Sequence, residues 1–427
     1  MSAGALNAAE AGAEIFMNNI NNDSTYQGTN NAPGTATDSC TGYTSAPVTF
    51  VENAIQGKVT YETCVKDGTI TGEKMVYATA KVYLPTTAAS PRVTRKIRLI
   101  INQALPASYT IMSGPGGLKL GNNVRITAGP IYVGGKLEMD NNAVIGSIAT
   151  PVTTYVADKA CPIPANATFP DFCPSGNSIT TDTNSHVYGD THVLNNVDAP
   201  SRFTHNGVVD NIVPPLNLPP ADHATLTSGL SNTTGMSSLN CPNNGTLHLS
   251  GHYTGTSTSG LTIGNNCTIL LDGNVWLDGN LALGNNSTLR PGDSVATPIN
   301  LIIDGSTGLT TGNNNFITAN ASGVGFNVYT FWSADTTCRP NCSNVIGAAL
   351  ADSQGITTIN LSNNVSGSAN ILFYSRWTKL MLNNNITVGQ LLGQAIELNN
   401  NGNIVFSSNT STTPGGWDVR YYERLYR

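Results

Sequence analysis

The sequence predicts a mainly β protein, a parallel β-helix preceded by an N-terminal α-helix and a small antiparallel sheet. Two observations point to the β-helix. Asn-Asn pairs or triplets begin at positions 122, 141, 265, 285, 313, 363, 383 and 399, and the steps 122 to 141, 265 to 285 and 363 to 383 are 19, 20 and 20 residues. A recurrence near twenty residues is typical of solenoids, whose coils bury an apolar face only by stacking. Large aliphatic residues alternate between these corners.

The composition sets the class of protein. Only 11% of the 427 residues are charged, the net charge is -6, and 39% are hydrophobic. A mild negative charge argues against nucleic acid as the main partner. The hydrophobic content and the regular spacing of short strands favour a packed fold over disorder.

Residues 1–22 are predicted to form the α-helix. Apolar residues recur there at steps of three and four and give one stripe along the helix, namely Leu6, Ala9, Ala13, Phe16 and Ile20. An amphipathic helix that covers its own domain would have the same pattern. Residues 23–113 are predicted to hold the antiparallel sheet, since "KVTYETCVKDG", "EKMVYATAKVYL" and "TRKIRLIINQ" are β-branched, alternating runs separated by turn residues.

Residues 114–427 are assigned to the β-helix. In "LLDGNVWLDGNLALGNNSTL" a shorter beat of five or six residues separates the corners, which suits strands of three to five residues. Gly and Asn tolerate left-handed backbone angles, and stacked Asn amides can satisfy one another's donors and acceptors. The irregular coil lengths favour a right-handed helix. The predicted corners include Asn265, Asn266, Gly273, Asn274, Gly279, Asn280, Gly284, Asn285 and Asn286.

The inside of this tube is predicted from the alternation along the strands. Ile269, Leu271, Val275, Leu277, Leu281 and Leu283 fall on one side and are expected to fill it. Residues 151–245 interrupt the coil rhythm with many prolines and histidines, so we expect a long excursion packed against the β-helix.

Eight cysteines fall into four neighbouring pairs, which suggests local disulfides formed in an oxidising compartment. The pairs are Cys40 with Cys64, Cys161 with Cys173, Cys241 with Cys267, and Cys338 with Cys342. Free buried thiols are the other reading, because connectivity cannot be deduced from sequence. No Cys lies near a His at zinc-ligand spacing.

The stretch "ALNAAEAGAEIFMNNI" resembles the second half of the N-terminal helix of PilX-type pilus-assembly proteins, with Ala8, Ala9, Glu10, Ala11 and Gly12 matching "AAEAG". The strands "ITGEKMVYATAKVYLP" and "TRKIRLIIN", the segment "DNIVPPLNLPP" and the ending "VGQLLGQAIELNNNGNIVF" with "WDVRYYERL" are also similar to parts of these proteins. The likeness touches both ends and the middle of the chain. The helix motif is moderately specific, whereas any Asn-rich β-helix would share the coil motifs.

The resemblance implies a non-enzymatic, pilin-like subunit at the cell surface, either at the tip of a type IV pilus or within the fibre. Its partners would be other pilin subunits through the N-terminal helix and surface or glycan ligands through the β-helix. The chain departs from the family in lacking the cleavage site and the hydrophobic half of the helix, along with the acidic residue that pilins carry near their start. We therefore expect either that Met1 is an artificial or processed start, or that this protein is not assembled in the usual way.

An enzyme is the main alternative, since β-helices also host polysaccharide lyases and glycosidases, and a phage-type spike is related to it. Such enzymes need carboxylates, alone or with a basic residue, over adjacent coils. Asp272, Asp278 and Asp304 lie in Asp-Gly corners, where turn formation explains them, and Glu138 and Glu397 look isolated. We expect no catalytic residues.

A candidate ligand surface is Tyr329, Phe331 and Trp332, since alternation places Tyr329 and Phe331 on one side of this strand and Trp332 on the other. Burial of these rings by packing is the other interpretation, and it is the usual one for aromatic residues on a strand. Exposed aromatic rings on such a flank could stack on sugars. His186, Asp190 and His192 match no established zinc spacing. No cofactor is expected; calcium is the ion that the Asp- and Asn-rich turns would suit best, although no dedicated loop motif is present.

Overall fold

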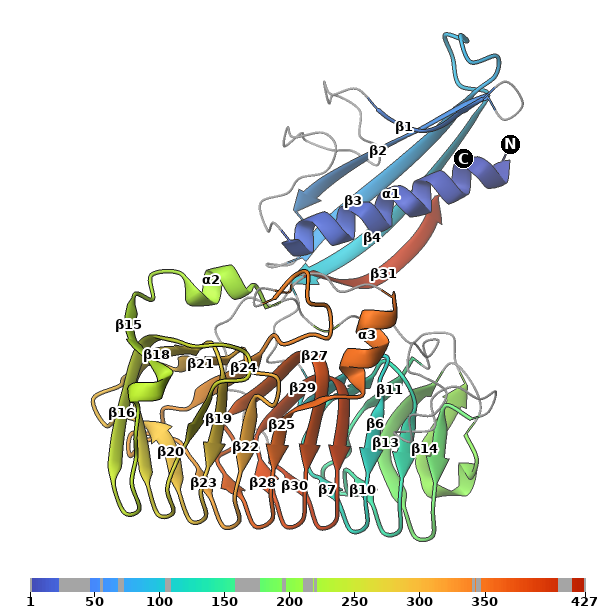
Figure 1. Ribbon diagram of the computed structural model, residues 1–427. Coiled ribbons are helices and arrows are strands. Elements are labelled where there is room, and N and C mark those ends of the chain that lie inside the picture. Colours follow the sequence, from blue (N-terminus) through green and yellow to red (C-terminus); the bar gives the residue numbers. More distant parts are fainter. Residues whose placement is uncertain are drawn as a thin grey trace. The chain divides into compact units, whose positions relative to one another are not determined.

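The computed structural model describes residues 2–22, 47–53, 57–67, 73–103, 109–157, 177–193, 197–209, 218, 221–339, 342, 347–405 and 417–425. The chain forms two compact units (Figure 1). The first consists of residues 1–105 together with 413–427, and the second of residues 106–412. We describe each unit by itself.

The first unit is built on a five-stranded antiparallel sheet. Its strands are β1 (Val48–Asn53), β2 (Gly57–Asp67), β3 (Glu73–Tyr83), β4 (Val93–Gln103) and β31 (Trp417–Leu425), in that order across the sheet. The three strands predicted from the sequence are β2, β3 and β4. The assignment of the closing segment "WDVRYYERL" to the β-helix was wrong, because β31 pairs along β4, with Trp417 opposite Gln103.

Helix α1 (Ser2–Asn22) packs on this sheet. The predicted stripe forms the contact: Ala9, Ala13, Phe16 and Ile20 are buried and Leu6 packs beside them. Small side chains let the helix approach the sheet closely. A Cβ atom at Gly12 would lie 2.7 Å from Cδ2 of Tyr61, so the glycine of the "AAEAG" motif is required by that ring. The helix therefore covers its own sheet.

The second unit is the predicted β-helix, and its strand pairs are parallel throughout the part of the chain that the structure describes. Two helices, α2 (His223–Thr227) and α3 (Gly347–Gln354), lie between strands, as do short 3-10 turns at Pro200–Arg202 and Met236–Ser238. The strands are β5 (Ile111–Ser113), β6 (Leu118–Leu120), β7 (Arg125–Ile126), β8 (Ile131–Val133), β9 (Leu137–Met139), β10 (Val144–Ile145), β11 (Thr154–Val156), β12 (Ile179–Thr181), β13 (His186–Val193), β14 (Phe203–Val209), β15 (Asn232–Gly235), β16 (Thr246–Thr254), β17 (Gly260–Thr262), β18 (Thr268–Leu277), β19 (Asn280–Leu283), β20 (Thr288–Pro291), β21 (Ile299–Ile303), β22 (Leu309–Thr311), β23 (Phe316–Ile317), β24 (Phe326–Thr330), β25 (Thr357–Leu361), β26 (Ser366–Gly367), β27 (Leu372–Leu382), β28 (Thr387–Val388), β29 (Gln390–Leu398) and β30 (Asn403–Ile404).

The coils do not stack in chain order. Strand β29 pairs with β5 and β6, and β30 pairs with β7, so the last coils of the chain lie directly on the first. In Figure 1 the red strands lie between the orange and the teal ones. The chain enters the β-helix at an inner position, extends it one way to β14, and resumes at β15 and β16, from where the coils lead back to the starting point. Because β4 and β31 are also neighbours, the β-helix is an insertion between two adjacent strands of the first unit.

One corner of the coil is marked by asparagine. The ten non-glycine residues with positive φ among those described are all Asn, with φ between 55° and 60°. Backbone N–H groups of these asparagines bond to the carbonyl of the next corner, for example from Asn266 to Asn285 at 2.9 Å and from Asn401 to Asn122 at 2.8 Å. In stacking order they are Asn244, Asn266, Asn286, Asn314, Asn364, Asn385, Asn401, Asn123, Asn142 and Asn184. The Asn corner of the prediction is confirmed.

The glycines have a different role from the one predicted. Gly273, Gly279 and Gly284 are absent from the positive-φ positions. A Cβ atom at Gly284 would lie 2.7 Å from the carbonyl oxygen of Ile263, so glycine is needed there because coils approach closely. Gly273 and Asn274 lie inside β18, where the Asn274 side-chain oxygen accepts from the Asn300 N–H at 2.9 Å.

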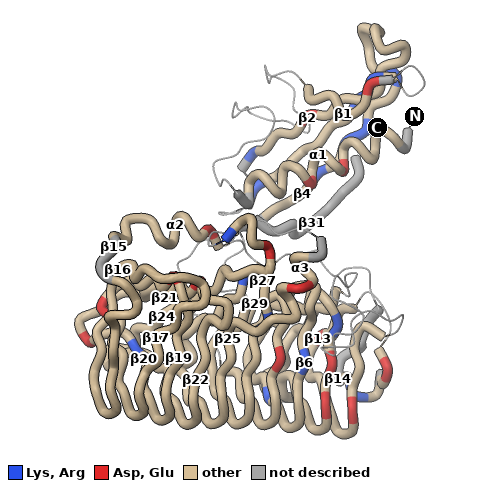
Figure 2. Tube along the Cα trace, in the orientation of Figure 1, with Lys and Arg blue, Asp and Glu red and all other residues tan. Residues whose placement is uncertain are grey.

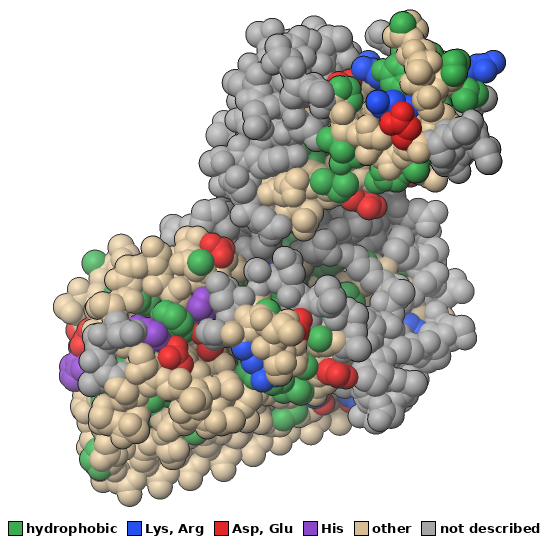
Figure 3. Space-filling view, turned by 45° about the horizontal axis from the view of Figure 1, so that its top comes forward, with side chains coloured by type: hydrophobic (Ala, Val, Ile, Leu, Met, Phe, Trp, Pro, Cys, Tyr) green, Lys and Arg blue, Asp and Glu red, His purple; other side chains and the backbone are tan. Residues whose placement is uncertain are grey.

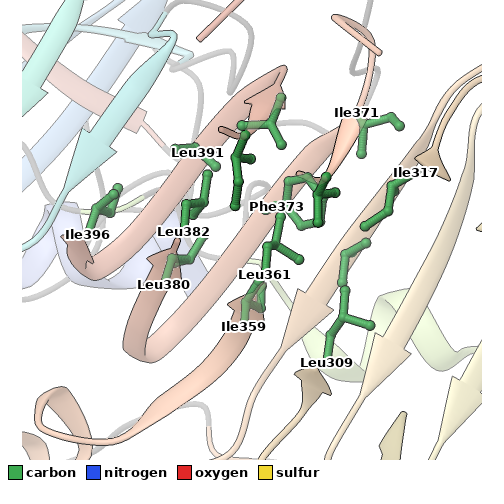
Figure 4. Close-up of a cluster of buried hydrophobic side chains, with 14 of the residues drawn as sticks. Leu309, Ile317, Ile359, Leu361, Ile371, Phe373, Leu380, Leu382, Leu391 and Ile396 are labelled. Atoms are coloured by element: carbon green, nitrogen blue, oxygen red, sulfur yellow. The ribbon is translucent and has the colours of Figure 1, made fainter. Parts of the chain in front are cut away.

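The interior is aliphatic, as the alternation predicts. All six predicted core residues are buried, and they join one continuous cluster that runs through the coils on both sides of the junction. Figure 4 shows part of it, where Ile317, Phe373, Leu380 and Leu391 point into the tube.

The predicted excursion at residues 151–245 is partly wrong. Strands β11 to β15 fall within it and belong to the parallel sheet. The coil rhythm is hidden there because its corner at Asn184 follows a threonine rather than a second asparagine.

Candidate functional site

The predicted ligand surface at Tyr329, Phe331 and Trp332 is not exposed. These side chains are 1%, 1% and 7% exposed. Tyr329 and Phe331 do point out of the coil, but they belong to a second apolar cluster on its outer face. Other members of this cluster are Met112, Tyr132, Ile302, Tyr374 and Leu392. A sugar could not reach these rings without a rearrangement, so the prediction of an exposed ligand surface is wrong.

A segment of the chain covers part of this aromatic face. We define the cover segment as residue 218 with residues 221–231, which includes α2. Leu218 is buried in the outer cluster. Its carbonyl accepts a bond from Nη1 of Arg376 at 3.2 Å, and the Ala221 N–H donates to the Tyr374 hydroxyl at 3.4 Å. The sequence stretch expected to be an excursion thus supplies a lid over outward-facing aromatic rings.

A buried, hydrogen-bonded His–Asp pair anchors the cover segment. Nε2 of His223 lies 2.8 Å from Oδ2 of Asp304, and the two side chains are 4% and 1% exposed. The same oxygen accepts a bond from Nε1 of Trp276 at 2.7 Å. Burial raises the pKa of the Asp304 carboxyl, although the bonds from His223 and Trp276 act in the opposite direction. The ring of His223 also meets the rings of Trp276 and Phe331 edge-on.

Two more His–Asp pairs lie on the neighbouring coils. Nε2 of His252 is 2.7 Å from Oδ1 of Asp278, and the His252 ring stacks on Trp276 with centroids 3.6 Å apart. Nδ1 of His248 is 2.7 Å from Oδ2 of the more exposed Asp272. Figure 3 shows histidine side chains beside acidic ones at the left end of the β-helix. Turn formation alone therefore does not explain the three Asp-Gly aspartates, since each of them binds a histidine.

The three His–Asp pairs do not amount to a metal site. Within the described part of the chain, no group of three or more His, Cys, Asp or Glu side chains could hold a metal ion. His186 and His192 are not drawn together: the His186 ring lies 4.2 Å from that of Tyr188, and the His192 ring stacks on Tyr155 at 5.0 Å.

A ladder of charges crosses the junction where the last coils meet the first. Nζ of Lys379 lies 3.0 Å from Glu397, and Nζ of Lys119 lies 2.8 Å from Glu138. The strand register places Lys119 between Glu397 and Glu138. Glu138 and Glu397 are therefore not isolated, contrary to expectation. Burial, together with the nearby carboxylates, raises the pKa of Asp140 against the influence of Lys119.

The Asn corner forms a mostly uncharged exposed edge. Side-chain amides bond along it, from Asn385 to Asn364 at 2.9 Å and from Asn364 to Asn314 at 3.0 Å. Most of the β-helix tube carries no charged residue in Figure 2. Two corners were not predicted from the sequence, Asn184 and the Asn243–Asn244 pair in "CPNNG", although the latter has the same Asn-Asn signal.

The structure contains the disulfides Cys241–Cys267 and Cys338–Cys342, two of the four pairs predicted from proximity. Cys64 is also disulfide-bonded. Cys40, Cys161 and Cys173 lie outside the described residues. Disulfides of this kind are typical of proteins in an oxidising compartment.

No protein-family model matches the chain, and no curated protein sequence is detectably similar. The chain is similar to a solved structure described as the competence-associated pilin ComZ from Thermus thermophilus, with 12% identity over 99% of this chain and 97% of that chain and a TM-score of 0.30. A similarity of this size carries no argument for fold or function. No helix in the described ranges has the length and apolar character needed to cross a membrane.

Proposed function

We propose that the protein is a non-enzymatic, pilin-like subunit of a surface filament, extracellular and pilus-associated, whose β-helix is displayed for adhesion. The observation that carries this proposal is the way the β-helix is inserted between β4 and β31 of a helix-on-sheet unit. Such an insertion leaves the smaller unit intact as an assembly module and adds a large uncharged surface to it. The "AAEAG" motif and the disulfides agree with this role.

The helix has one surface left for neighbouring subunits. The stripe of Ala9, Ala13, Phe16 and Ile20 faces the chain's own sheet, so it is not free for partners. The outer side of α1 presents Asn7, Glu14 and Ile15, and Ile15 is 42% exposed. Contacts with other subunits through α1 would use this side.

The proposal is tested with the helix. Ile15→Asp should reduce incorporation into surface filaments while leaving the fold of the purified chain unchanged by circular dichroism. Glu14→Gln, on the same side, is the matched control and should have little effect. If the protein is never recovered from sheared filaments, or if no coding sequence for a basic leader and about twenty apolar residues precedes Met1, the pilin assignment fails.

The second candidate is a polysaccharide-degrading enzyme. It is favoured by Lys119 between Glu138 and Glu397 on adjacent coils, with the raised pKa of Asp140 beside them. Incubation with uronic-acid polymers and a measurement of new unsaturated or reducing ends tests it. If the unmodified chain degrades such a polymer and Glu138→Gln does not, the protein is an enzyme and the adhesive role is wrong.

A further inference from the structure

Phe316 is an exposed aromatic side chain on the outer surface of the β-helix. It is 48% exposed, whereas every other Phe, Tyr and Trp described in the second unit is buried or half-buried. The next residue, Ile317, points into the tube (Figure 4), so alternation along β23 directs Phe316 outward. Burial in the core therefore does not explain this ring.

The neighbours of Phe316 are hydroxyl side chains. In the register of the parallel strands Thr288 lies on one side of it and Ser366 on the other. Adjacent strands are about 4.8 Å apart, so both hydroxyls flank the ring on the same face. The row continues with Thr268 beyond Thr288 and with Thr387 beyond Ser366. This row therefore has one apolar group, the exposed ring of Phe316, with polar hydroxyl groups on both sides of it.

The charged groups beside Thr288 are paired with each other. Arg290, two residues beyond Thr288, forms a two-pronged pair with Asp293, with Nη1–Oδ1 and Nη2–Oδ2 distances of 2.5 and 3.3 Å. On the other side of Phe316 is the corner amide of Asn314, which accepts a bond from Asn364. The site thus offers donors and acceptors without an unpaired charge among the residues named.

We propose that Phe316, with the hydroxyls of Thr288 and Ser366, forms a stacking platform for a pyranose ring of a neutral polysaccharide. The C–H face of a sugar packs on an aromatic ring, and its hydroxyls bond to side chains around the ring. An anionic polymer is disfavoured at Phe316 and Thr288, because Arg290 beside them is already paired with Asp293. The next exposed cation in this row, Arg125, lies four strands beyond Phe316. A protein partner is disfavoured because one ring among hydroxyls is far smaller than the roughly 800 Å² per partner of a stable interface.

The repeat of the coils extends this platform. Thr268 and Thr387 continue the same row, so successive units of a polymer can meet hydroxyls at a constant spacing. Many weak contacts of this kind suit multivalent attachment. The inference deepens the proposed adhesive role and its biological use rests on it, but its chemistry is tested on the purified chain.

The experiment measures retention of the purified full chain on immobilised cellulose, mannan and dextran, with polygalacturonate as the charged comparison. Phe316→Ala should weaken binding to at least one neutral polymer by about tenfold. Phe316→Trp should retain binding and show a change in tryptophan emission when that polymer is added in soluble form. Ile148→Ala is the matched control, because Ile148 is another exposed apolar side chain of the same unit, 84% exposed. This variant should bind the polymers as the unmodified chain does.

Three results would overturn the platform: no retention on any neutral polymer, equal retention of Phe316→Ala and the unmodified chain, or retention on polygalacturonate alone. Incorporation into filaments is scored separately for Phe316→Ala. If Phe316→Ala enters filaments normally but no longer binds the polymer, both proposals are supported. If the unmodified chain binds the polymer but never enters filaments, the stacking platform stands and the pilin role is wrong.

Discussion

The buried pair of His223 and Asp304 should control how tightly the cover segment lies on the aromatic face. We consider His223→Ala, Asp304→Ala and the double variant. In His223→Ala the carboxyl of Asp304, which is 1% exposed, keeps the bond from Trp276 as its one side-chain partner among the described residues. In Asp304→Ala, both His223 and the indole N–H lose their acceptor. Each single change therefore leaves a polar or charged group without its partner in a buried place.

The size of the effect follows from burial. Removing one partner of a buried pair costs about 3–5 kcal/mol because the other is left uncompensated. The double variant removes both groups, so its cost should be smaller than the sum of the two by roughly 2 kcal/mol. If the cover segment opens instead, His223 or Asp304 becomes hydrated and the loss appears as local opening rather than as unfolding of the coils.

Hydrogen exchange of the peptide that spans α2 is the suitable measurement. The N–H of Leu226, which bonds to the Asp222 carbonyl at 3.0 Å, should exchange faster in either single variant, by about a hundredfold for a loss near 3 kcal/mol. Peptides from β27 and β29 should keep their protection and serve as the internal control. The pair does not anchor the cover segment if the loss of stability in the double variant equals the sum of the two single losses. The same conclusion follows if exchange at Leu226 is unchanged in the single variants.

Four further changes test other parts of the structure. Asp304→Asn should flatten the pH dependence of stability, because burial raises the pKa of the Asp304 carboxyl above 3.8 in the folded chain. The unmodified chain should therefore lose stability relative to this variant as the pH rises from 3.8 to the folded pKa. Urea midpoints measured at several pH values check this. Asn364→Ala should be less stable than Asn364→Gly by about 1 kcal/mol, because the residue has a φ of 60°, and thermal melting of the two compares them. Replacing Cys241 and Cys267 by serine should cost about 3 kcal/mol, since the bridge closes a loop with a separation of 26, and equal denaturation midpoints would contradict this. Gly12→Val should loosen α1 from the sheet, because a Cβ would lie 2.7 Å from the Tyr61 ring, and faster proteolysis within α1 is the readout.

Local sequence patterns were enough to predict the architecture of this protein. Asn-Asn corners at steps near twenty residues predict the coils, and alternation predicts that Leu271, Leu277 and Leu283 fill them, because both depend only on neighbouring residues. The same is true of the helix stripe and of the strands β2 to β4. Backbone geometry at the corner followed from residue type, since asparagine tolerates the left-handed region that each coil needs there.

The order of the coils was decided only in three dimensions. Ten of the described corners carry the same asparagine, and the coils share one aliphatic interior, so sequence alone allows any of these coils to stack on any other. Long-range contacts make the choice, among them the placing of Lys119 between Glu397 and Glu138 at the junction and the pairing of β31 with β4. The burial of the aromatic face could not be predicted from the sequence either. Alternation shows that Tyr329 points outward, but it does not show that the cover segment lies over it. Tertiary contacts between distant residues, such as His223 and Asp304, settle both questions, since their energy depends on burial that no local pattern records.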